Sequence, residues 1–211
     1  RPGITTEYLD DLAHEYITGQ GASPSFLGYR GFPKTICTSV NEEIVHGIPG
    51  KRILNEGDIV GIDIGAIVEG YHGDSAFTWA VGEVGEFNNA LLEAGEGSLH
   101  AAFPYCKVGH RIGDLSSAVQ EYAESRGFSV VREYVGHGIG RMLHEEPSVP
   151  NYGAPGKGLP LRPGMVLAIE PMVNVGTWRT RLLEDNWTVI TEDGQHSVHF
   201  EHTVAITEGQ P

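Results

Sequence analysis

The sequence predicts an α+β fold built from two similar halves. Strand-like and helix-like runs occur in two rounds, one on each side of residue ~110, which is typical of an α+β domain. No low-complexity segment or Pro/Ser-rich linker separates the two rounds. A chain of 211 residues is long enough for one domain with a full hydrophobic core, so we expect residues 1–211 to form a single domain.

The first predicted element is a helix near the start of the chain. Thr5 or Thr6 can cap it, and acidic residues follow in its first turns, where they favour the helix dipole. Gly19 and Gly21 end it. A loop rich in aromatic residues follows, and then a short strand over 35–40.

Two long strands, 58–68 and 71–81, are predicted next, joined by a turn at Glu69-Gly70. Apolar spacing then favours two helices before a last group of strands. These remaining elements are helices over 86–102 and 113–126 and strands over 165–175, 187–191 and 198–207.

Four acidic residues lie within or at the ends of apolar predicted strands, namely Asp63, Asp74, Glu170 and Glu201. An unpaired carboxylate among apolar residues costs free energy, and like charges brought together must bind cations or protons. Two divalent ions would neutralise the charge of four carboxylates. A solvated strand edge is the alternative for the aspartates, and a salt bridge is the alternative for the glutamates.

The predicted hairpin brings Asp63 and Asp74 together in either of two registers. A turn centred on Val68-Glu69 places them directly opposite, whereas a turn centred on Glu69-Gly70 places them on a diagonal of one face. Direct cross-strand neighbours have β-carbons about 4.5–5.5 Å apart, a spacing suited to flanking a metal pair.

A histidine in a glycine-rich run is the fifth candidate ligand. His137 lies between Gly136 and Gly138, and we expect these glycines to let the backbone turn and the imidazole project. A phosphate-binding loop is the alternative, but the spacing matches neither the dinucleotide nor the P-loop fingerprint. A set of carboxylates and imidazole suits Mn, Fe, Co or Zn.

Composition excludes several classes of protein. A net charge of −14 and a pI near 5.0 argue against nucleic acid as a partner. No apolar run reaches the roughly 18 residues needed to span a membrane. Two cysteines, Cys37 and Cys106, are too few for a disulfide framework and favour a reducing, intracellular setting. The chain opens with Arg1 rather than methionine, so we expect that an N-terminal segment has been removed.

Seven motifs, in order along residues 29–207, resemble those of methionine aminopeptidases. They are Asn41 to Pro49, Ile62-Asp63-Ile64-Gly65, His72-Gly73-Asp74, Gly136 to Gly140, His144-Glu145-Glu146-Pro147, Ile169-Glu170-Pro171-Met172 and Phe200-Glu201-His202-Thr203. The resemblance is closest to the type I branch. It implies the pita-bread (creatinase/aminopeptidase) fold, with two pseudo-symmetric halves, a central antiparallel sheet and outer helices. Residues 1–211 would then be a single metallopeptidase catalytic domain.

The resemblance also implies the roles of the ligands. Asp63 would bind one divalent metal, and His137 and Glu170 the other. Asp74 and Glu201 would bridge the two ions, which could be Co, Mn, Fe or Zn. Glu170 would in addition carry a proton during catalysis.

Two more histidines have catalytic roles implied by the resemblance. His46 would contact the scissile amide, and His144 would steady the oxygen of the tetrahedral intermediate, because an imidazole near developing charge lowers the barrier. A structural role is the alternative for both.

The substrate pocket implied by the resemblance is narrow and aromatic. Its residues would be Tyr29, Phe32, Cys37 and Trp187, with Phe26 as a further candidate, and His46 and His144 would contact the substrate. Leu143 departs from the family pattern, in which an aromatic residue often precedes the histidine, so the pocket could be wider. His199 shares a predicted strand face with Glu201, which suggests that it supports the ligands.

The function expected from the resemblance is removal of N-terminal methionine from nascent proteins whose second residue is small, by hydroxide attack at a dinuclear metal site. An Xaa-Pro aminopeptidase or prolidase-like peptidase is one alternative, and a non-catalytic pita-bread binding protein is another. We expect a monomer that associates transiently with the ribosome, without a membrane or nucleic-acid partner. The expected location is the cytoplasm, with an organelle as the alternative.

Overall fold

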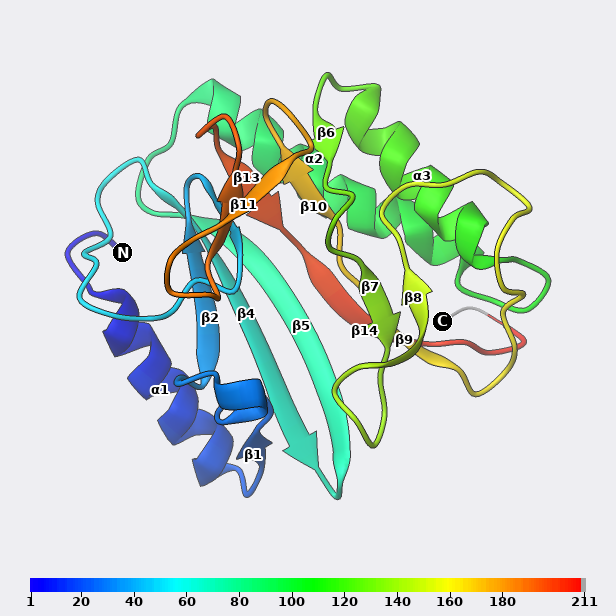
Figure 1. The fold of residues 1–211 in the computed structure, drawn as a ribbon, viewed down its shortest axis with the longest axis horizontal. Helices are drawn as coiled ribbons and strands as arrows, with labels where there is room; N and C mark the ends of the chain where they lie inside the picture. The colour runs from blue at the N-terminus through cyan, green and yellow to red at the C-terminus, as the bar shows by residue number, and fades with distance from the viewer. Residues whose placement is uncertain (210–211) are drawn as a thin grey trace.

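The computed structural model describes residues 1–209, and its centre is an eight-stranded antiparallel sheet (Figure 1). Seven strands follow one another across it: β1 (Ser23–Pro24), β4 (Ile59–Val68), β5 (Tyr71–Ala80), β14 (Glu201–Ala205), β9 (Val166–Ile169), β7 (Gly136–Gly138) and β8 (Glu145–Val149). The eighth strand, β2 (Ile36–Val40), also pairs with β4. The α+β class and the central antiparallel sheet are therefore confirmed.

Two three-stranded antiparallel sheets accompany the large one. The first has the order β13 (Ser197–His199), β10 (Met172–Asn174) and β6 (Ser129–Val130). The second has the order β11 (Thr180–Leu182), β12 (Val189–Thr191) and β3 (Glu43–Val45).

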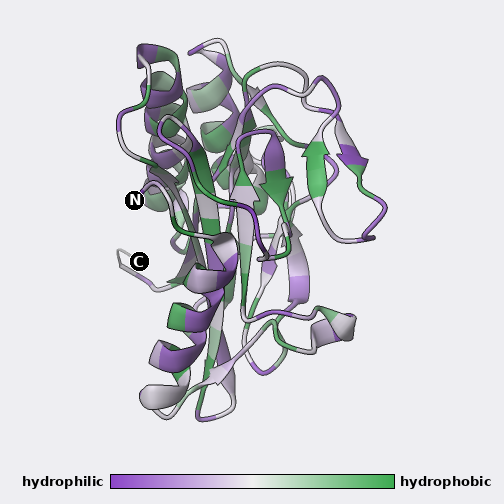
Figure 2. Ribbon diagram, turned by 90° about the vertical axis from the view of Figure 1, so that its left-hand side faces the viewer, coloured by the Kyte–Doolittle hydropathy of each residue, from purple (hydrophilic) through white to green (hydrophobic). Residues whose placement is uncertain are grey.

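The helices lie along one side of the strands, and short strands and loops lie on the other (Figure 2). They are α1 (Thr6–Gly19), α2 (Glu86–Ala102) and α3 (Ile112–Glu124), with short 3₁₀ turns η1 (Tyr29–Gly31) and η2 (Phe103–Tyr105). Thr5 caps α1, since its hydroxyl accepts a hydrogen bond from the Tyr8 N–H at 3.2 Å. Thr6 is the first helical residue, and the predicted helices are found within two residues of their expected bounds. In residues 1–209, no helix is both long and apolar enough to cross a membrane.

The main hydrophobic core lies between the helix pair α2 and α3 and the strands of the second half. Leu91, Leu99 and Leu115 from the helices pack with Ile169 and Phe200, and all five are almost completely buried. Burying a side chain of this size stabilises a fold by about 1.5–3 kcal/mol. This core holds β9, β13 and β14 in place.

The long hairpin adopts the second of the two predicted registers. Val68 pairs with Tyr71, so Glu69 and Gly70 form the turn, with φ of 52° and 81°. Positive φ at both central residues is the geometry of a tight hairpin turn. Asp63 consequently pairs with Ala76, and Asp74 lies on a diagonal of the same face.

Two predicted long strands are each broken in the structure. The strand expected over 165–175 divides into β9 and β10, and that expected over 198–207 divides into β13 and β14. Pro171 lacks an N–H and cannot continue the ladder. The chains nevertheless stay in register, because Met172 pairs with His199 on one side of the break and Ile169 pairs with His202 on the other. The same register places Glu170 opposite Glu201, where the strands pass from one sheet to another.

Candidate metal centre and active site

Every predicted site residue lines one cavity of about 160 Å³. The five predicted metal ligands come from different strands of the large sheet or from the residue that follows one. Asp63 is on β4, Asp74 on β5, His137 on β7, Glu170 directly after β9, and Glu201 at the start of β14. The convergence expected from the sequence is therefore found, whereas the role of each side chain toward a metal stays a prediction.

The His137 imidazole lies close to two of the carboxylates but is too far from them for a hydrogen bond. Its Nε2 lies 3.6 Å from Glu170 Oε1 and 3.9 Å from Asp74 Oδ2. One donor atom each from Asp74, His137 and Glu201 falls within a 4.8 Å group. Donors at this spacing can share one cation.

Electrostatics make the cluster unfavourable as a set of bare charges. Burial, followed by repulsion from Asp74, raises the pKa values of Asp63, Glu170 and Glu201 well above their ordinary values. Burial likewise raises the pKa of Asp74 to about 7. Within residues 1–209, the ion-pair partners of these carboxylates are histidines, not lysine or arginine. Divalent cations would supply the missing positive charge.

Buried polar atoms around the cavity test whether a metal fits. Asp63 Oδ1, Asp74 Oδ1 and Glu201 Oε1 are buried and accept no hydrogen bond. Nε2 of His199 is also buried without a hydrogen-bond partner. Such atoms are costly unless something binds them. Oxygen and imidazole donors match Mn, Fe, Co or Zn, so these residues fit a divalent metal.

The glycines beside His137 serve a different purpose from the one predicted. Gly136 and Gly138 lie in the extended strand β7, not in a turn. A β-carbon on Gly136 would lie 2.4 Å from the Ala168 carbonyl oxygen, and one on Gly138 would lie 2.3 Å from the Glu146 carbonyl oxygen. These glycines therefore permit the close approach of β9 and β8 that places the imidazole in the cavity.

The two predicted catalytic histidines line the cavity and contact aromatic rings. His46 has φ of 61° and packs its ring against the Tyr134 ring, with centroids 5.8 Å apart. Burial lowers the pKa of His46 to about 4. Desolvation, and then the neighbouring His137 and Arg30, lower the pKa of His144. Both imidazoles are therefore neutral at pH 7, and in each ring one nitrogen is an acceptor and the other a donor.

The loop before β2 supplies a residue that sequence reasoning missed. Arg30 lines the cavity, is exposed, and holds its guanidinium carbon 5.4 Å from the Tyr29 ring centroid. Arg30 has a φ of 48° and Gly28 a φ of 83°, so the loop contains left-handed residues at both positions. The only signal in the sequence was a basic residue in a glycine-flanked aromatic loop.

The apolar wall of the cavity is built from the predicted pocket residues. Phe32 and Trp187 meet edge to face, with centroids 5.0 Å apart. Phe26, Cys37 and Leu143 are buried in the same cluster. Cys37 pairs with Asp63 across the sheet, and burial raises the pKa of its thiol well above the ordinary value. The sulfur is thus a neutral apolar surface for a ligand.

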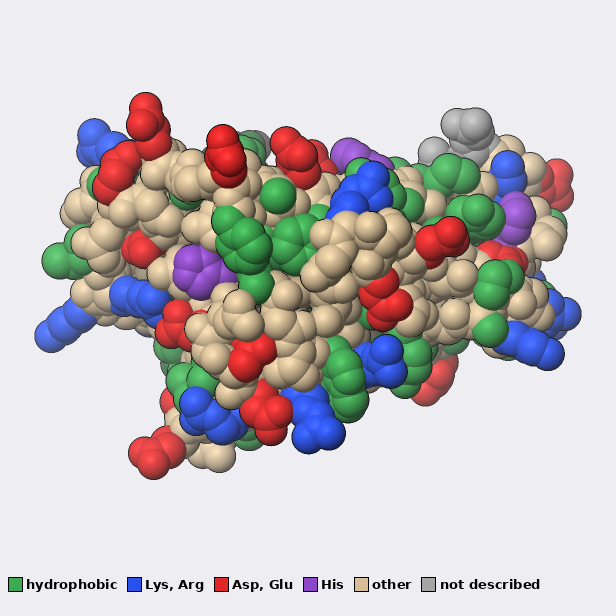
Figure 3. All heavy atoms as spheres, turned by 90° about the horizontal axis from the view of Figure 1, so that it is seen from above, with side chains coloured by type: hydrophobic (Ala, Val, Ile, Leu, Met, Phe, Trp, Pro, Cys, Tyr) green, Lys and Arg blue, Asp and Glu red, His purple; other side chains and the backbone are tan. Residues whose placement is uncertain are grey.

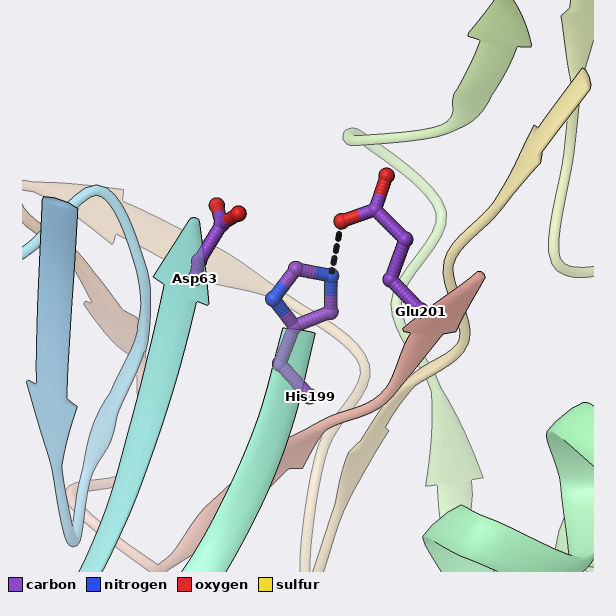
Figure 4. A group of neighbouring side chains, drawn as sticks. All are labelled: Asp63, His199 and Glu201. Carbon is purple, nitrogen blue, oxygen red and sulfur yellow. Dashed lines mark ion pairs between the residues drawn. The ribbon is translucent and has the colours of Figure 1, made fainter. Parts of the chain in front are cut away.

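His199 is near the carboxylates, as expected from the sequence. Its Nε2 lies 3.6 Å from Glu170 Oε2 and 3.8 Å from Glu201 Oε2, and Figure 4 shows it between Asp63 and Glu201. Burial lowers the pKa of His199 to about 3, so the ring is neutral.

The fold and this carboxylate–imidazole cavity define a metallopeptidase. The family model described as metallopeptidase family M24 matches residues 1–208, and the chain belongs to that family. Among its relatives, methionine aminopeptidase 1 of Bacillus subtilis (strain 168) is 57% identical over 208 residues, which are 99% of this chain and 84% of that protein. A methionine aminopeptidase of Clostridium acetobutylicum is 52% identical over 212 residues, covering 100% of this chain and 85% of that protein.

Solved structures agree on the pita-bread fold. The chain matches the crystal structure of methionine aminopeptidase from Rickettsia prowazekii with a TM-score of 0.98 and 43% identity, over 100% of this chain and 85% of that one. The match to methionine aminopeptidase from Thermotoga maritima has a TM-score of 0.97 and 48% identity, and it covers 99% of this chain and 84% of that one. A prolidase from Pyrococcus furiosus shares the fold, with a TM-score of 0.74 and 24% identity, and the match covers 99% of this chain and 55% of that one.

Proposed function

We propose that this protein is a metal-dependent aminopeptidase that removes the N-terminal methionine of proteins whose second residue is small. The observation that carries the proposal is the meeting of five ligand-type side chains, from five places in the chain, beside an aromatic pocket. Identity above 50% with methionine aminopeptidases over the whole chain supports the same activity. The prolidase-like alternative has weaker support, since its relatives are far less similar.

Two divalent ions, Co, Mn, Fe or Zn, would be held by the four carboxylates and His137. Asp63 would bind one ion, His137 and Glu170 the other, and Asp74 and Glu201 both. When present, such ions lower the pKa of a coordinated water and polarise a carbonyl. The charges of the ions and of the four carboxylates then cancel.

The chain's own residues would move the protons. Glu170 is buried, which raises its pKa, so this side chain is suited to taking up a proton and passing it on. The neutral His46 ring faces the cavity and would hydrogen bond to the scissile amide. His144 receives a hydrogen bond at Nδ1 when the Tyr29 hydroxyl donates to it, which leaves the ring proton on Nε2 for a substrate oxygen.

The pocket would select methionine by size and by the softness of its walls. A cavity of about 160 Å³ resembles, in volume, apolar cavities of about 150 Å³ that hold one benzene molecule. The rings of Phe32 and Trp187 border it, and a thioether gains about 0.3–1.5 kcal/mol from contact with an aromatic ring. An unbranched side chain with sulfur is the ligand that such a space favours.

The wider setting belongs to the same proposal. A single catalytic domain acting as a monomer in the cytoplasm, in transient contact with the ribosome, would meet nascent proteins as they emerge. Acidic and basic side chains are interspersed on the face drawn in Figure 3, as on an ordinary solvated surface.

Release of methionine from Met-Ala-Ser tests the proposal. We expect release after loading with Mn or Co, its loss in a chelator, and its loss in the Asp74→Asn and Glu170→Ala variants. Undiminished turnover in both variants would overturn the mechanism. Preferential cleavage of an Xaa-Pro peptide would favour a prolidase, and a folded protein that binds no metal would favour the non-catalytic alternative.

A further inference from the structure

We propose that His199 is a sixth metal ligand, which binds a divalent ion together with Asp63 and Glu201. This inference rests on the proposed metallopeptidase function and adds a residue to the five-ligand set. It gives the centre two imidazoles instead of one.

The first argument is the grouping of donor atoms. One donor atom each from Asp63, His199 and Glu201 lies within a 4.8 Å group, and so does one each from Asp74, His137 and Glu201. Each group has one aspartate and one histidine, and Glu201 is common to both. Figure 4 shows the His199 ring between the other two side chains of its group. The carboxylate cluster thus offers two donor groups that could each hold a metal ion, each with its own imidazole.

The second argument is the distance of His199 from its neighbours. Its Nε2 lies 3.8 Å from Oε2 of Glu201, the glutamate of its own donor group, which is too long for a hydrogen bond. Two donors that each lie about 2.0–2.2 Å from one ion are roughly 3–4 Å apart. The observed spacing therefore suits common coordination better than direct contact.

The third argument is that Nε2 of His199 is buried and has no hydrogen-bond partner within residues 1–209. The residue is 3% exposed, and its Nε2 has no hydrogen-bond partner. A buried nitrogen left in this state costs about 1–3 kcal/mol. If His199 served only for packing, this unpaired nitrogen would destabilise the fold. A bound metal ion would instead accept its lone pair.

The backbone holds the ring in position. The His199 N–H donates to Thr78 Oγ1 at 2.9 Å, and the His199 carbonyl accepts from the same hydroxyl at 2.9 Å. His199 also pairs with Met172 at the point where the strand breaks. These contacts fix the residue to β5 and β10, as a ligand requires.

A second imidazole changes which metals the centre prefers. Nitrogen donors favour Zn, Co and Fe over the harder Mn. Replacing His199 by Gln should therefore weaken Zn or Co binding more than Mn binding. We expect a loss of at least about tenfold for Zn, because even residues that only orient ligands contribute 10–100-fold to affinity.

Affinity alone does not separate a ligand from a supporting residue, so the decisive measurement counts imidazoles. X-ray absorption of the zinc-loaded protein should show an average of about one imidazole per metal in the wild type and about half of that in His199→Gln. The control is His196→Gln, since His196 contacts Asn88 at 2.9 Å and belongs to neither donor group. An unchanged imidazole count in folded His199→Gln overturns the inference.

A measurement on the wild type covers the case in which the variant does not fold. In protein carrying ¹⁵N-labelled histidine, zinc should shift the ring nitrogens of two residues to metal-coordinated values. One shifted ring overturns the inference and leaves the proposed function intact. A wild type that binds no zinc, Mn or Co and leaves Met-Ala-Ser uncut overturns the proposed function itself.

Discussion

The Tyr29 hydroxyl lies 2.9 Å from Nδ1 of His144, and the two rings stack with centroids 5.3 Å apart. The loop that carries the apolar wall and the loop that carries the histidine are therefore joined by one hydrogen bond. When the Tyr29 hydroxyl donates, this bond keeps the ring proton of His144 on Nε2, so we expect Tyr29 to act on catalysis through His144.

We expect Tyr29→Phe to lower kcat for Met-Ala-Ser about threefold to tenfold, with a smaller change in KM. A neutral hydrogen bond contributes about 0.5–1.5 kcal/mol. Without it, the ring proton of His144 is no longer held on Nε2, the nitrogen that would contact the substrate. Steady-state kinetics of the metal-loaded enzyme measure the split. A change confined to KM would assign Tyr29 to substrate binding alone.

We expect Leu143→Phe to make the enzyme more selective for methionine over leucine. Leu143 is 3% exposed and lies in the apolar cluster of the pocket, so a ring there narrows the cavity. A difference of one methylene in an apolar pocket changes discrimination by about 10-fold or more. The ratio of kcat/KM for Met-Ala-Ser and Leu-Ala-Ser reports it. Leu27→Phe, at an exposed position of the neighbouring loop, is the control and should leave the ratio unchanged.

The metal-free protein should become less stable as the pH rises. The ordinary pKa of Asp74 is 3.8, and burial raises it to about 7 in the fold. Between these values the folded state binds more protons than the unfolded state, so the free energy of unfolding falls with increasing pH. The stability that the protonated carboxyl contributes is complete below about pH 4 and lost as the pH passes about 7.

Thermal unfolding of chelator-treated protein between pH 5 and 8 measures this effect. Each kcal/mol lost lowers Tm by about 2–4 °C for a chain of this size. Asp74→Asn should flatten the dependence, whereas Asp11→Asn, at an exposed site, should not. Equal slopes in all three proteins would contradict the assignment to Asp74.

We expect Gly138→Ala to destabilise the protein and to weaken metal binding. Its β-carbon would lie 2.3 Å from the Glu146 carbonyl oxygen, which forces β7 and β8 apart next to His137. Overpacking of this kind costs about 1–3 kcal/mol. Denaturant unfolding and zinc titration give the two readouts. Gly73→Ala is the matched control. Gly73 is next to the predicted ligand Asp74, as Gly138 is next to His137, but a β-carbon on Gly73 would meet no atom of the described residues within 4 Å.

Much of the site followed from the sequence because its signals are local. Asp63 and Asp74 interrupt apolar strands, and alternation of faces along a hairpin places them together in either register. Sequence could not choose between the registers with certainty, since that depends on the turn at Glu69-Gly70. Helix bounds followed from caps and glycine in the same local way.

The parts that escaped prediction depend on distant partners. The strands β6 and β11 have two and three residues, too few for a periodic signal, and they exist because other strands pair with them. The strand break at Phe200 contains no proline and lies opposite the break at Pro171. The Phe200 N–H donates a hydrogen bond to the Pro171 carbonyl oxygen at 3.2 Å. Arg30 reaches the cavity only through the left-handed turn of its loop.

The paired strand breaks have a consequence for how the molecule transmits change. Glu170 and Glu201 sit where two neighbouring strands leave the large sheet for the small one, so a shift of one sheet against the other would move both carboxylates relative to the other three predicted metal ligands. Substitutions far away, at Val130 or Val173 in the small sheet, would then tune ion affinity without touching the cavity. We therefore expect the packing of the small sheet to influence metal binding at the cavity.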